Sequence, residues 1–241
     1  MKLKYASILA VLLCIVLVCV LTYNNVSRDI TSQDQKYIQS ILAESGYELS
    51  TIENNHIFED QIIAIQAVQD AILTQTPKQQ IIPLGTSREP AALYKREGAF
   101  CGDRSRFMDK ALRLAGFEVR YASIYETSKI KQPVLALLSR DKDKVRSHAM
   151  IEVKTQKGWM MVDSVTRWIA LTKDGAVYSF EEWQNTSKSQ NINWIEQPGN
   201  IYFILENDFT YIYGLYSRHG KFYPPYWPIP DVNWHELSSN F

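Results

Sequence analysis

Cysteine is scarce in this chain of 241 residues, which contains three. Two of them, Cys14 and Cys19, lie in an apolar N-terminal run, and Cys101 stands alone in the remainder. Since a disulfide needs two thiols, a small secreted fold held together by disulfides is excluded. Three readings of Cys101 remain: a buried thiol that acts as a small hydrophobic group, an intermolecular disulfide, or a reactive thiol.

Net charge and metal-binding patterns are also lacking. The 26 basic and 26 acidic side chains give a formal net charge of 0, so there is no reason to expect a nucleic-acid partner. The four histidines show no metal-ligand spacing, and no second cysteine outside the N-terminal run supports a zinc site. No internal repeat is visible, which excludes a solenoid. The sequence implies no cofactor.

A long apolar run is present at the N-terminus. Lys2 and Lys4 precede a stretch from Tyr5 to Ser27 that contains no charged residue. A helix of about 20 apolar residues can cross a bilayer, whereas a signal peptide ends in a small-residue cleavage site. Residues 22–27, TYNNVS, are a poor cleavage site. We therefore expect an uncleaved single-pass membrane anchor, with a cleaved signal peptide as the alternative, and an extracytoplasmic (periplasmic or extracellular) remainder.

Helical periodicity marks four segments of the remainder. These segments are residues 32–45, 59–75, about 91–96 and 101–115. In the last of them, apolar residues recur at steps of three and four, and Gly116 follows where a helix C-terminus favours glycine. The pattern predicts that Cys101 lies in the first turn of a helix.

Strand patterns follow that helix. Residues 117–125 are rich in aromatic and β-branched side chains, which is typical of a strand. Residues 147–165 predict a hairpin with its turn at 156–158. His148 lies near the entry of this hairpin and Asp163 near its exit, so we expect them roughly opposite one another on adjacent strands.

The position of Cys101 favours a nucleophile. A thiol attacks as its thiolate, and both a helix N-terminus and a neighbouring imidazolium favour that form. The predicted helix supplies the first, and His148 supplies the second if the hairpin packs against the start of this helix. Asp163 is placed to fix the tautomer of the imidazole and to stabilise its protonated form. The sequence therefore predicts a Cys101–His148–Asp163 catalytic triad.

Four segments together resemble the transglutaminase-like family of cysteine enzymes. They are GAFC (98–101), LRLAGFEVR (112–120), SHAMIEV (147–153) and GWMMVD (158–163). The resemblance implies an α+β fold with a papain-like core, in which the helix that bears the cysteine packs on an antiparallel sheet that bears His148 and Asp163. It also implies that the cysteine attacks an amide or ester carbonyl and that water or an amine then resolves the thioester. From the expected location alone, the substrate would be a peptide, a protein or a glycan-linked acyl group of the cell envelope.

The sequence departs from the family pattern at two places. Met150 stands where the family usually has tryptophan, and Ser164-Val165 replaces the more familiar Pro-Thr. These departures leave the acyl acceptor open. Two alternatives to such an enzyme are also open: a binding or scaffold protein of the cell envelope that keeps the fold without turnover, and a cysteine peptidase with a defined cleavage sequence.

A thioester mechanism also requires an oxyanion hole. The main-chain N–H of Cys101 is the first candidate donor. Gln80, Tyr94 and Arg96 are the candidates for the second.

The chain is thus predicted to have four parts. They are the anchor or signal peptide (1–27), an N-terminal helical part (28–97), the catalytic core (98–170) and an aromatic-rich C-terminal extension (171–241). We expect the aromatic side chains of the extension to cover the core, although stacking on sugar rings and contact with a membrane interface are other roles for such groups. Trp159 is predicted to belong to the core itself.

Overall fold

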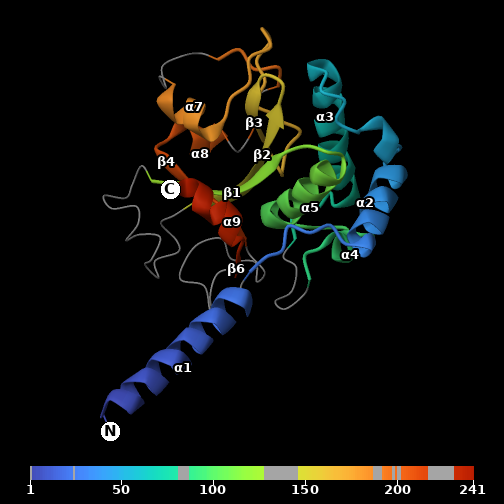
Figure 1. The fold of residues 1–241 in the computed structure, drawn as a ribbon. Coiled ribbons are helices and arrows are strands. Elements are labelled where there is room, and N and C mark those ends of the chain that lie inside the picture. Colours follow the sequence, from blue (N-terminus) through green and yellow to red (C-terminus); the bar gives the residue numbers. More distant parts are fainter. Residues whose placement is uncertain are drawn as a thin grey trace.

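The centre of the protein is a four-stranded antiparallel sheet in the order β3–β2–β1–β4 (Figure 1). The strands are β1 (Val119–Glu126), β2 (Ser147–Thr155), β3 (Gly158–Val162) and β4 (Phe209–Tyr213). The structure, a computed structural model, describes residues 2–23, 25–80, 87–127, 146–186, 192–196, 199, 202–216 and 231–241. The predicted α+β architecture with an antiparallel sheet is confirmed.

Helices cover both faces of the sheet. Helices α2, α3 and α5 lie together on one side, and α7 and α8 lie on the other (Figure 1). The helices are α1 (Lys2–Tyr23), α2 (Ser32–Glu44), η1 (Leu49–Thr51), α3 (Phe58–Gln75), α4 (Pro90–Leu93), α5 (Cys101–Leu114), α7 (Phe180–Asn185), α8 (Tyr202–Glu206), α9 (Trp234–Leu237) and η4 (Ser238–Asn240). The periodicity located α2, α3 and α5 to within one residue. Helix α4 is shorter than predicted because Tyr94 adopts an extended backbone and Lys95 a positive φ of 60°.

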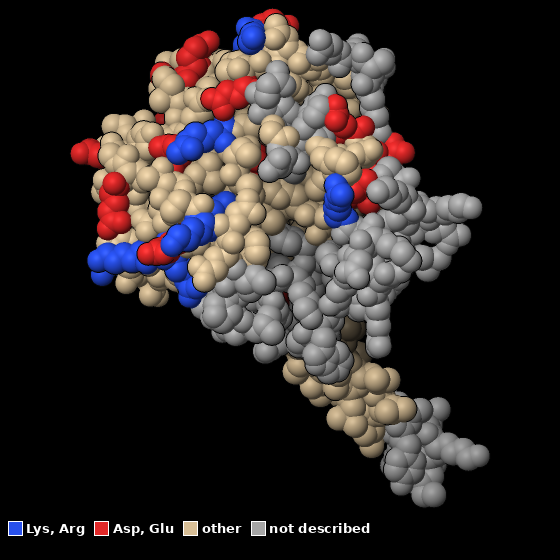
Figure 2. Space-filling view, turned by 180° about the vertical axis from the view of Figure 1, so that it is seen from behind, with Lys and Arg blue, Asp and Glu red and all other residues tan. Residues whose placement is uncertain are grey.

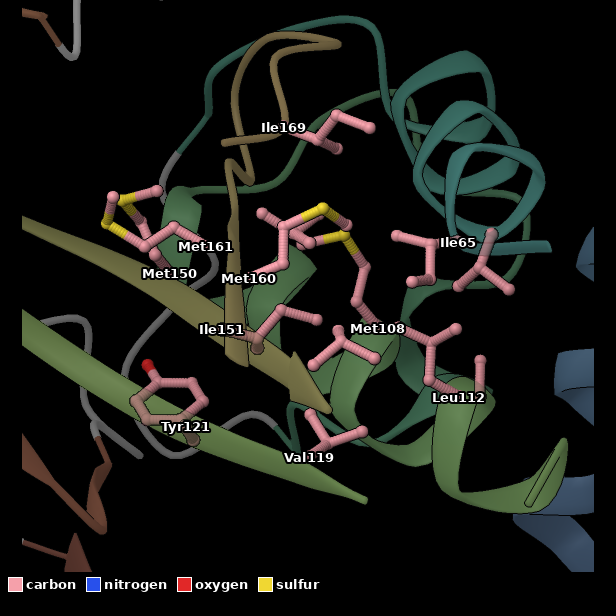
Figure 3. Close-up of a cluster of buried hydrophobic side chains, with 14 of the residues drawn as sticks. Ile65, Met108, Leu112, Val119, Tyr121, Met150, Ile151, Met160, Met161 and Ile169 are labelled. Carbon is pink, nitrogen blue, oxygen red and sulfur yellow. The ribbon is translucent and has the colours of Figure 1, made fainter. Parts of the chain in front are cut away.

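One hydrophobic cluster fills the space between α3, α5 and the sheet (Figure 3). Ile65 of α3, Met108 and Leu112 of α5, and Ile151 of β2 are fully buried there. Gly116, with a φ of +88°, lets the chain turn back from α5 toward β1, a conformation that disfavours other residues. This packing fixes α5 against the strand that carries His148.

Trp159 does not belong to the buried core, so that prediction is wrong. It is half-buried on the edge strand β3, where the guanidinium carbon of Arg120 lies 3.8 Å from its ring centroid and Lys154 Nζ lies 5.2 Å from it. These two cations cover the ring that the sequence pattern assigned to the interior. Trp168, 1% exposed, is a core tryptophan.

The aromatic extension provides part of the sheet. Strand β4 pairs with β1, with Ala122 opposite Tyr213. Phe209, Tyr213 and Tyr216 are buried, in agreement with a covering role. The proline-rich segment of the extension, including Tyr223, Tyr226 and Trp227, lies outside the described residues.

The chain just after α1 is bound to the C-terminal part of the protein. Val26 N–H donates to the carbonyl of Val232, at 2.7 Å, in β6 (Asp231–Val232), which itself pairs with β5 (Leu215–Tyr216). Asn233 Nδ2 donates to the carbonyl of Val26 at 2.8 Å, and an Arg106 guanidinium nitrogen donates to that of Ser27 at 2.9 Å. Residues 26 and 27 are therefore part of the folded body.

Helix α1 itself projects from that body (Figure 2). Its side chains from Ile8 to Cys19 are exposed, and most of them are large and apolar. In the part of the chain that the structure describes, no helix is long and apolar enough to cross a membrane. The anchor at 1–27 therefore stays a prediction.

On the face shown in Figure 2, the described Lys and Arg side chains are interspersed with Asp and Glu.

A buried carboxylate, Glu236 of α9, joins this junction to α5. It accepts hydrogen bonds from the hydroxyl of Tyr216 at 2.6 Å and from the guanidinium of Arg113 at 2.9 Å, and Arg28 Nε lies 3.6 Å from it. Burial and the charge of Asp109 raise the pKa of Glu236 to about 6, against the opposing effects of Tyr216, Arg113 and Arg28. The folded protein therefore keeps a proton that the unfolded chain, with a pKa near 4.5, has released.

Replacing Glu236 by glutamine is expected to flatten the pH dependence of stability. The free energy of unfolding of the wild type should fall as pH rises from about 4.5 to about 6, by up to about 2 kcal/mol. Denaturant titrations at pH 5 and pH 7 measure this slope. The exposed Glu181→Gln is the control, and an unchanged slope in Glu236→Gln would contradict the assignment.

Candidate active site

Cys101 is the first residue of α5, as predicted. The helix begins here because Phe100 has an extended backbone and its N–H donates to Asp103 Oδ2 at 2.9 Å. Main-chain N–H groups in a first helical turn have no acceptor within the helix and carry a partial positive charge. The side chain of Cys101 is partly exposed, so the thiol is open to reagents at a helix end that favours its anion.

The carboxylate of Asp103 lies in the same turn and opposes a second negative charge there. Arg88 forms a buried ion pair with Asp103 that offsets this repulsion. Both side chains are buried, so solvent screens the pair little. The ion pair with Arg88 therefore reduces the repulsion between Asp103 and a negative charge at Cys101.

His148 and Asp163 meet at the other side of the site. His148 Nε2 lies 2.7 Å from Asp163 Oδ1. The two residues are not directly opposite in the ladder, because Val162, the last residue of β3, pairs with Ile151. Asp163 lies just beyond the end of β3, and its side chain reaches diagonally to His148. The hairpin thus brings the two together as predicted, although its register differs from the simple picture.

The charge state of His148 ties it to Cys101. Burial alone would lower the pKa of His148. A negative charge on Cys101, the hydrogen bond to Asp163 and its charge, and a hydrogen bond to Cys101 together raise that pKa to about 10. Since Asp163 occupies Nε2, the nitrogen left for the thiol is Nδ1. The imidazolium is therefore the expected form at neutral pH whenever the thiol is ionised.

Asp163 is completely buried and accepts four hydrogen bonds. Its Oδ1 receives His148 Nε2 and the N–H of Ser164, at 2.7 Å each. Its Oδ2 receives the N–H of Thr166 at 2.8 Å and the hydroxyl of Thr166 at 2.5 Å. Burial favours the neutral acid, but the hydrogen bond and charge of His148 and the two bonds from Thr166 hold the pKa of Asp163 below its usual range. Asp163 is thus a fixed anion.

The turn after Asp163 is held from a distant helix. Gln69 of α3 is 1% exposed, and its Nε2 lies 2.8, 3.0 and 2.9 Å from the carbonyls of Asp163, Thr166 and Trp168. The hydroxyl of Ser164 donates to the carbonyl of Ala149 in β2 at 2.6 Å. These bonds position the carboxylate that contacts His148.

Sequence reasoning missed the role of Gln69. The available signal was a polar residue on the apolar face of a predicted helix, between Ile65 and Ile72. A buried amide must find hydrogen-bond partners. The pattern could therefore have marked Gln69 as a structural tie, but not what it binds.

The three candidates for a second oxyanion donor lie in different places. The side chain of Gln80 lies against Gly98, where an added Cβ would come 2.6 Å from Gln80 Cβ. The hydroxyl of Tyr94 donates to Glu44 of α2 at 2.8 Å, and Arg96 Nε donates to a main-chain carbonyl of α4 at 2.8 Å. Of the three, Gln80 lies beside the segment that leads into Cys101.

Removing the thiol is expected to lower the pKa of His148. The charge of Cys101 is the largest of the effects that raise this pKa, so Cys101→Ala removes it and leaves the opposing effect of burial. NMR titration of the His148 ring measures the change. Cys14→Ser, in α1, is the matched control and should leave the pKa of His148 unchanged; an equally unchanged pKa in Cys101→Ala would show that the two side chains are not coupled.

Comparison with known families gives one match. Residues 58–164 match the family model of the transglutaminase-like superfamily. No curated protein sequence matches the chain. The matched region begins at the first residue of α3 and ends just past Asp163, so it includes all three residues of the predicted triad together with Gln69.

Proposed function

We propose, from the transglutaminase-like domain at residues 58–164, that this protein is a cysteine hydrolase or acyltransferase. Members of this superfamily are generally papain-like cysteine enzymes. Cys101 is the nucleophile, His148 the general acid and base, and Asp163 the residue that orients His148. The observation that carries the proposal is the 2.7 Å contact between buried His148 and Asp163, beside a partly exposed thiol at a helix N-terminus.

The first half of the reaction is acylation. The thiolate of Cys101 attacks the carbonyl carbon of an amide or ester, and a C–S bond forms as the carbonyl oxygen takes the negative charge. The N–H groups at the start of α5 are suited to stabilise that oxyanion. The C–N or C–O bond then breaks, His148 gives its proton to the leaving group, and a thioester remains.

The second half is deacylation. Water or an amine attacks the thioester carbonyl while neutral His148 accepts its proton. The C–S bond breaks, the sulfur leaves as a thiolate, and the imidazolium is restored beside it. Asp163 keeps Nδ1 directed at the reacting atoms in both steps through its contact with Nε2.

Water and amine acceptors can be distinguished by product analysis. Incubation of the full chain with a mixture of peptides, in H₂¹⁸O and with a labelled primary amine, would place ¹⁸O in new carboxyl groups for hydrolysis, or the amine in new amide bonds for transfer. Cys101→Ser is the control. A defined set of cleaved bonds would favour a sequence-specific peptidase.

The location belongs to the same proposal. The exposed apolar side chains of α1 support attachment to a membrane. Lys2 and Lys4 before that run favour an N-terminus on the cytoplasmic side and a catalytic domain outside it. A peptide, protein or glycan-linked acyl group of the cell envelope is the substrate class that fits this location.

The test of the proposal is the pH dependence of Cys101 alkylation by iodoacetamide. The full chain is used in detergent, with Cys14→Ser and Cys19→Ser so that one thiol reports. We expect fast alkylation that persists well below pH 8, and a loss of at least tenfold at pH 6 in His148→Ala, because an isolated thiol ionises near pH 8.5.

Two results would favour the alternative, a binding or scaffold protein. One is slow alkylation that rises only near pH 8–9, alike in both proteins, since a scaffold has no need of an activated thiol. The other is no alkylation at all, which would mean that the thiol is not accessible. His56→Ala, an exposed histidine, is the matched control and should leave the profile unchanged.

A further inference from the structure

Arg104 lies one helical turn after Cys101 and is 2% exposed. Its Nε donates to the hydroxyl of Thr76 at 3.1 Å, and one terminal nitrogen donates to the carbonyls of Thr76 at 2.5 Å and Lys78 at 3.2 Å. The other terminal nitrogen lies 3.5 Å from the carbonyl of Ser164. A single guanidinium of α5 thus contacts two separate segments around the site, residues 76–78 and Ser164.

Two of these contacts lead directly to the catalytic residues. The carbonyl of Lys78 also accepts the N–H of Ala99 at 3.0 Å, so Arg104 holds the segment that precedes Cys101. Ser164 follows Asp163, so the other contact reaches the turn that supplies the carboxylate. Displacement of Arg104 would therefore loosen the nucleophile and the orienting carboxylate together.

Arg104 differs in its partners from the other two arginines of α5, buried Arg106 and half-buried Arg113. Arg106 and Arg113 both pair with Asp109. Among the residues that the structure describes, no carboxylate lies within ion-pair distance of Arg104, and its contacts there are neutral oxygens. A buried cation without a counter-ion is costly, so a nearby anion is expected to compensate it.

The thiolate of Cys101 fits this requirement. Residues three apart share one face of a helix, which places Arg104 on the side of α5 that carries Cys101. Burial lowers the pKa of Arg104, and the largest effect against this comes from a negative charge on Cys101, ahead of the carboxylates of Asp103 and Asp163. The attraction is mutual, so Arg104 stabilises the thiolate in return.

We propose that Arg104 is a positioning residue of this site: its buried guanidinium joins the segment before Cys101 to the turn after Asp163, and its positive charge stabilises the Cys101 thiolate. The inference rests on the proposed function, because it assigns Arg104 to the activation of the same thiol. It adds a cation that stays charged at every working pH, whereas His148 exchanges its proton during turnover.

The experiment compares alkylation profiles of Arg104→Gln, Arg104→Lys and the control Arg113→Gln. All are made in the full chain with Cys14→Ser and Cys19→Ser, and near-ultraviolet circular dichroism checks their folding. Loss of the charge in Arg104→Gln should move the pH of half-maximal alkylation to higher pH by about one unit, roughly a tenfold loss of rate at low pH. Arg104→Lys should retain most of the wild-type profile, and Arg113→Gln all of it.

His148→Ala separates this inference from the function on which it rests. If His148→Ala loses low-pH reactivity while folded Arg104→Gln coincides with the wild type, the role of Arg104 is overturned and the proposed function stands. If His148→Ala coincides with the wild type, the proposed function fails. Should Arg104→Gln not fold, Arg104→Met, which keeps the length of the side chain without its charge, takes its place: a shift of the profile to higher pH that Arg104→Lys does not show supports the charge effect, and a wild-type profile overturns it.

Discussion

Asparagine at position 163 is expected to reduce turnover on the order of 10³–10⁴-fold, comparable to loss of the orienting carboxylate in other catalytic triads. The same substitution should lower the pKa of His148, because the hydrogen bond and charge of Asp163 both raise it. Alkylation of Cys101 at pH 6 should therefore fall together with turnover. NMR titration measures the pKa of His148, and the alkylation profile measures the reactivity of Cys101; neither measurement needs a substrate.

Asparagine is a poor replacement at this position for a specific reason. Both carboxylate oxygens of Asp163 receive N–H donors, Oδ1 from Ser164 and Oδ2 from Thr166. An amide has a single carbonyl oxygen, so its NH₂ group must face one of these donors in either orientation. A buried donor left without an acceptor costs about 1–3 kcal/mol. Asp163→Asn should thus lose stability as well as activity.

The control for Asp163→Asn must be a variant that loses stability but leaves the side chains around Cys101 and His148 unchanged. Asp109→Asn meets this need, because Asp109 is equally buried and pairs with Arg106 and Arg113 of its own helix. It should be destabilised while its alkylation profile stays that of the wild type. A profile of Asp163→Asn that matches the wild type would show that Asp163 does not orient His148.

Gln69→Leu is expected to cost about 3 kcal/mol of unfolding free energy, since it leaves the carbonyls of Asp163, Thr166 and Trp168 without their common donor. The turn that carries the Asp163 carboxylate should loosen, and the low-pH alkylation of Cys101 should decline with it. Denaturant titration and the alkylation profile report the two consequences.

Gln61→Leu is the matched control on the same helix. Gln61 is also buried, but it contacts Asn54 and the N–H of Gln156 at the far end of the hairpin. It should lose stability without changing the reactivity of Cys101. Gln69→Glu adds a sharper test: the new carboxyl group must stay protonated to donate, so the loss of stability from pH 5 to pH 8 should be larger in this variant than in the wild type. An equal loss in the two proteins would contradict the contacts of Gln69.

The parts of the site that the sequence predicts are those set by local patterns. The three-and-four spacing after Cys101 predicts a helix that begins at the thiol, and Gly116 predicts where it ends. The alternation around His148 and the tight turn after it predict a hairpin that brings Asp163 back. Each of these signals acts over less than about 20 residues, within which periodicity and turn residues determine structure.

Features that depend on packing between distant segments were not predictable. Gln69 contacts residues 94 to 99 positions away, and Arg104 contacts Ser164 across 60 positions. Periodicity shows that such side chains lie on a helix face but not which carbonyls they meet. The burial of Trp159 was predicted wrongly for a different reason. An aromatic residue in a strand pattern is usually assigned to the core, whereas here Arg120 and Lys154 cover Trp159 at the surface of the sheet.

The connection between α1 and the rest of the protein determines how far the nucleophile can travel. Val26 and Ser27 are hydrogen-bonded to Val232, Asn233 and Arg106, and the indole nitrogen of Trp234 donates to the carbonyl of Leu21 at 2.9 Å. The residues after α1 are therefore bound to the domain and do not act as a flexible linker, so the position of the domain relative to α1 is not set by linker length. Cys101 is therefore held at a fixed distance from α1, and in the proposed reaction a substrate must reach that position to acylate the thiol.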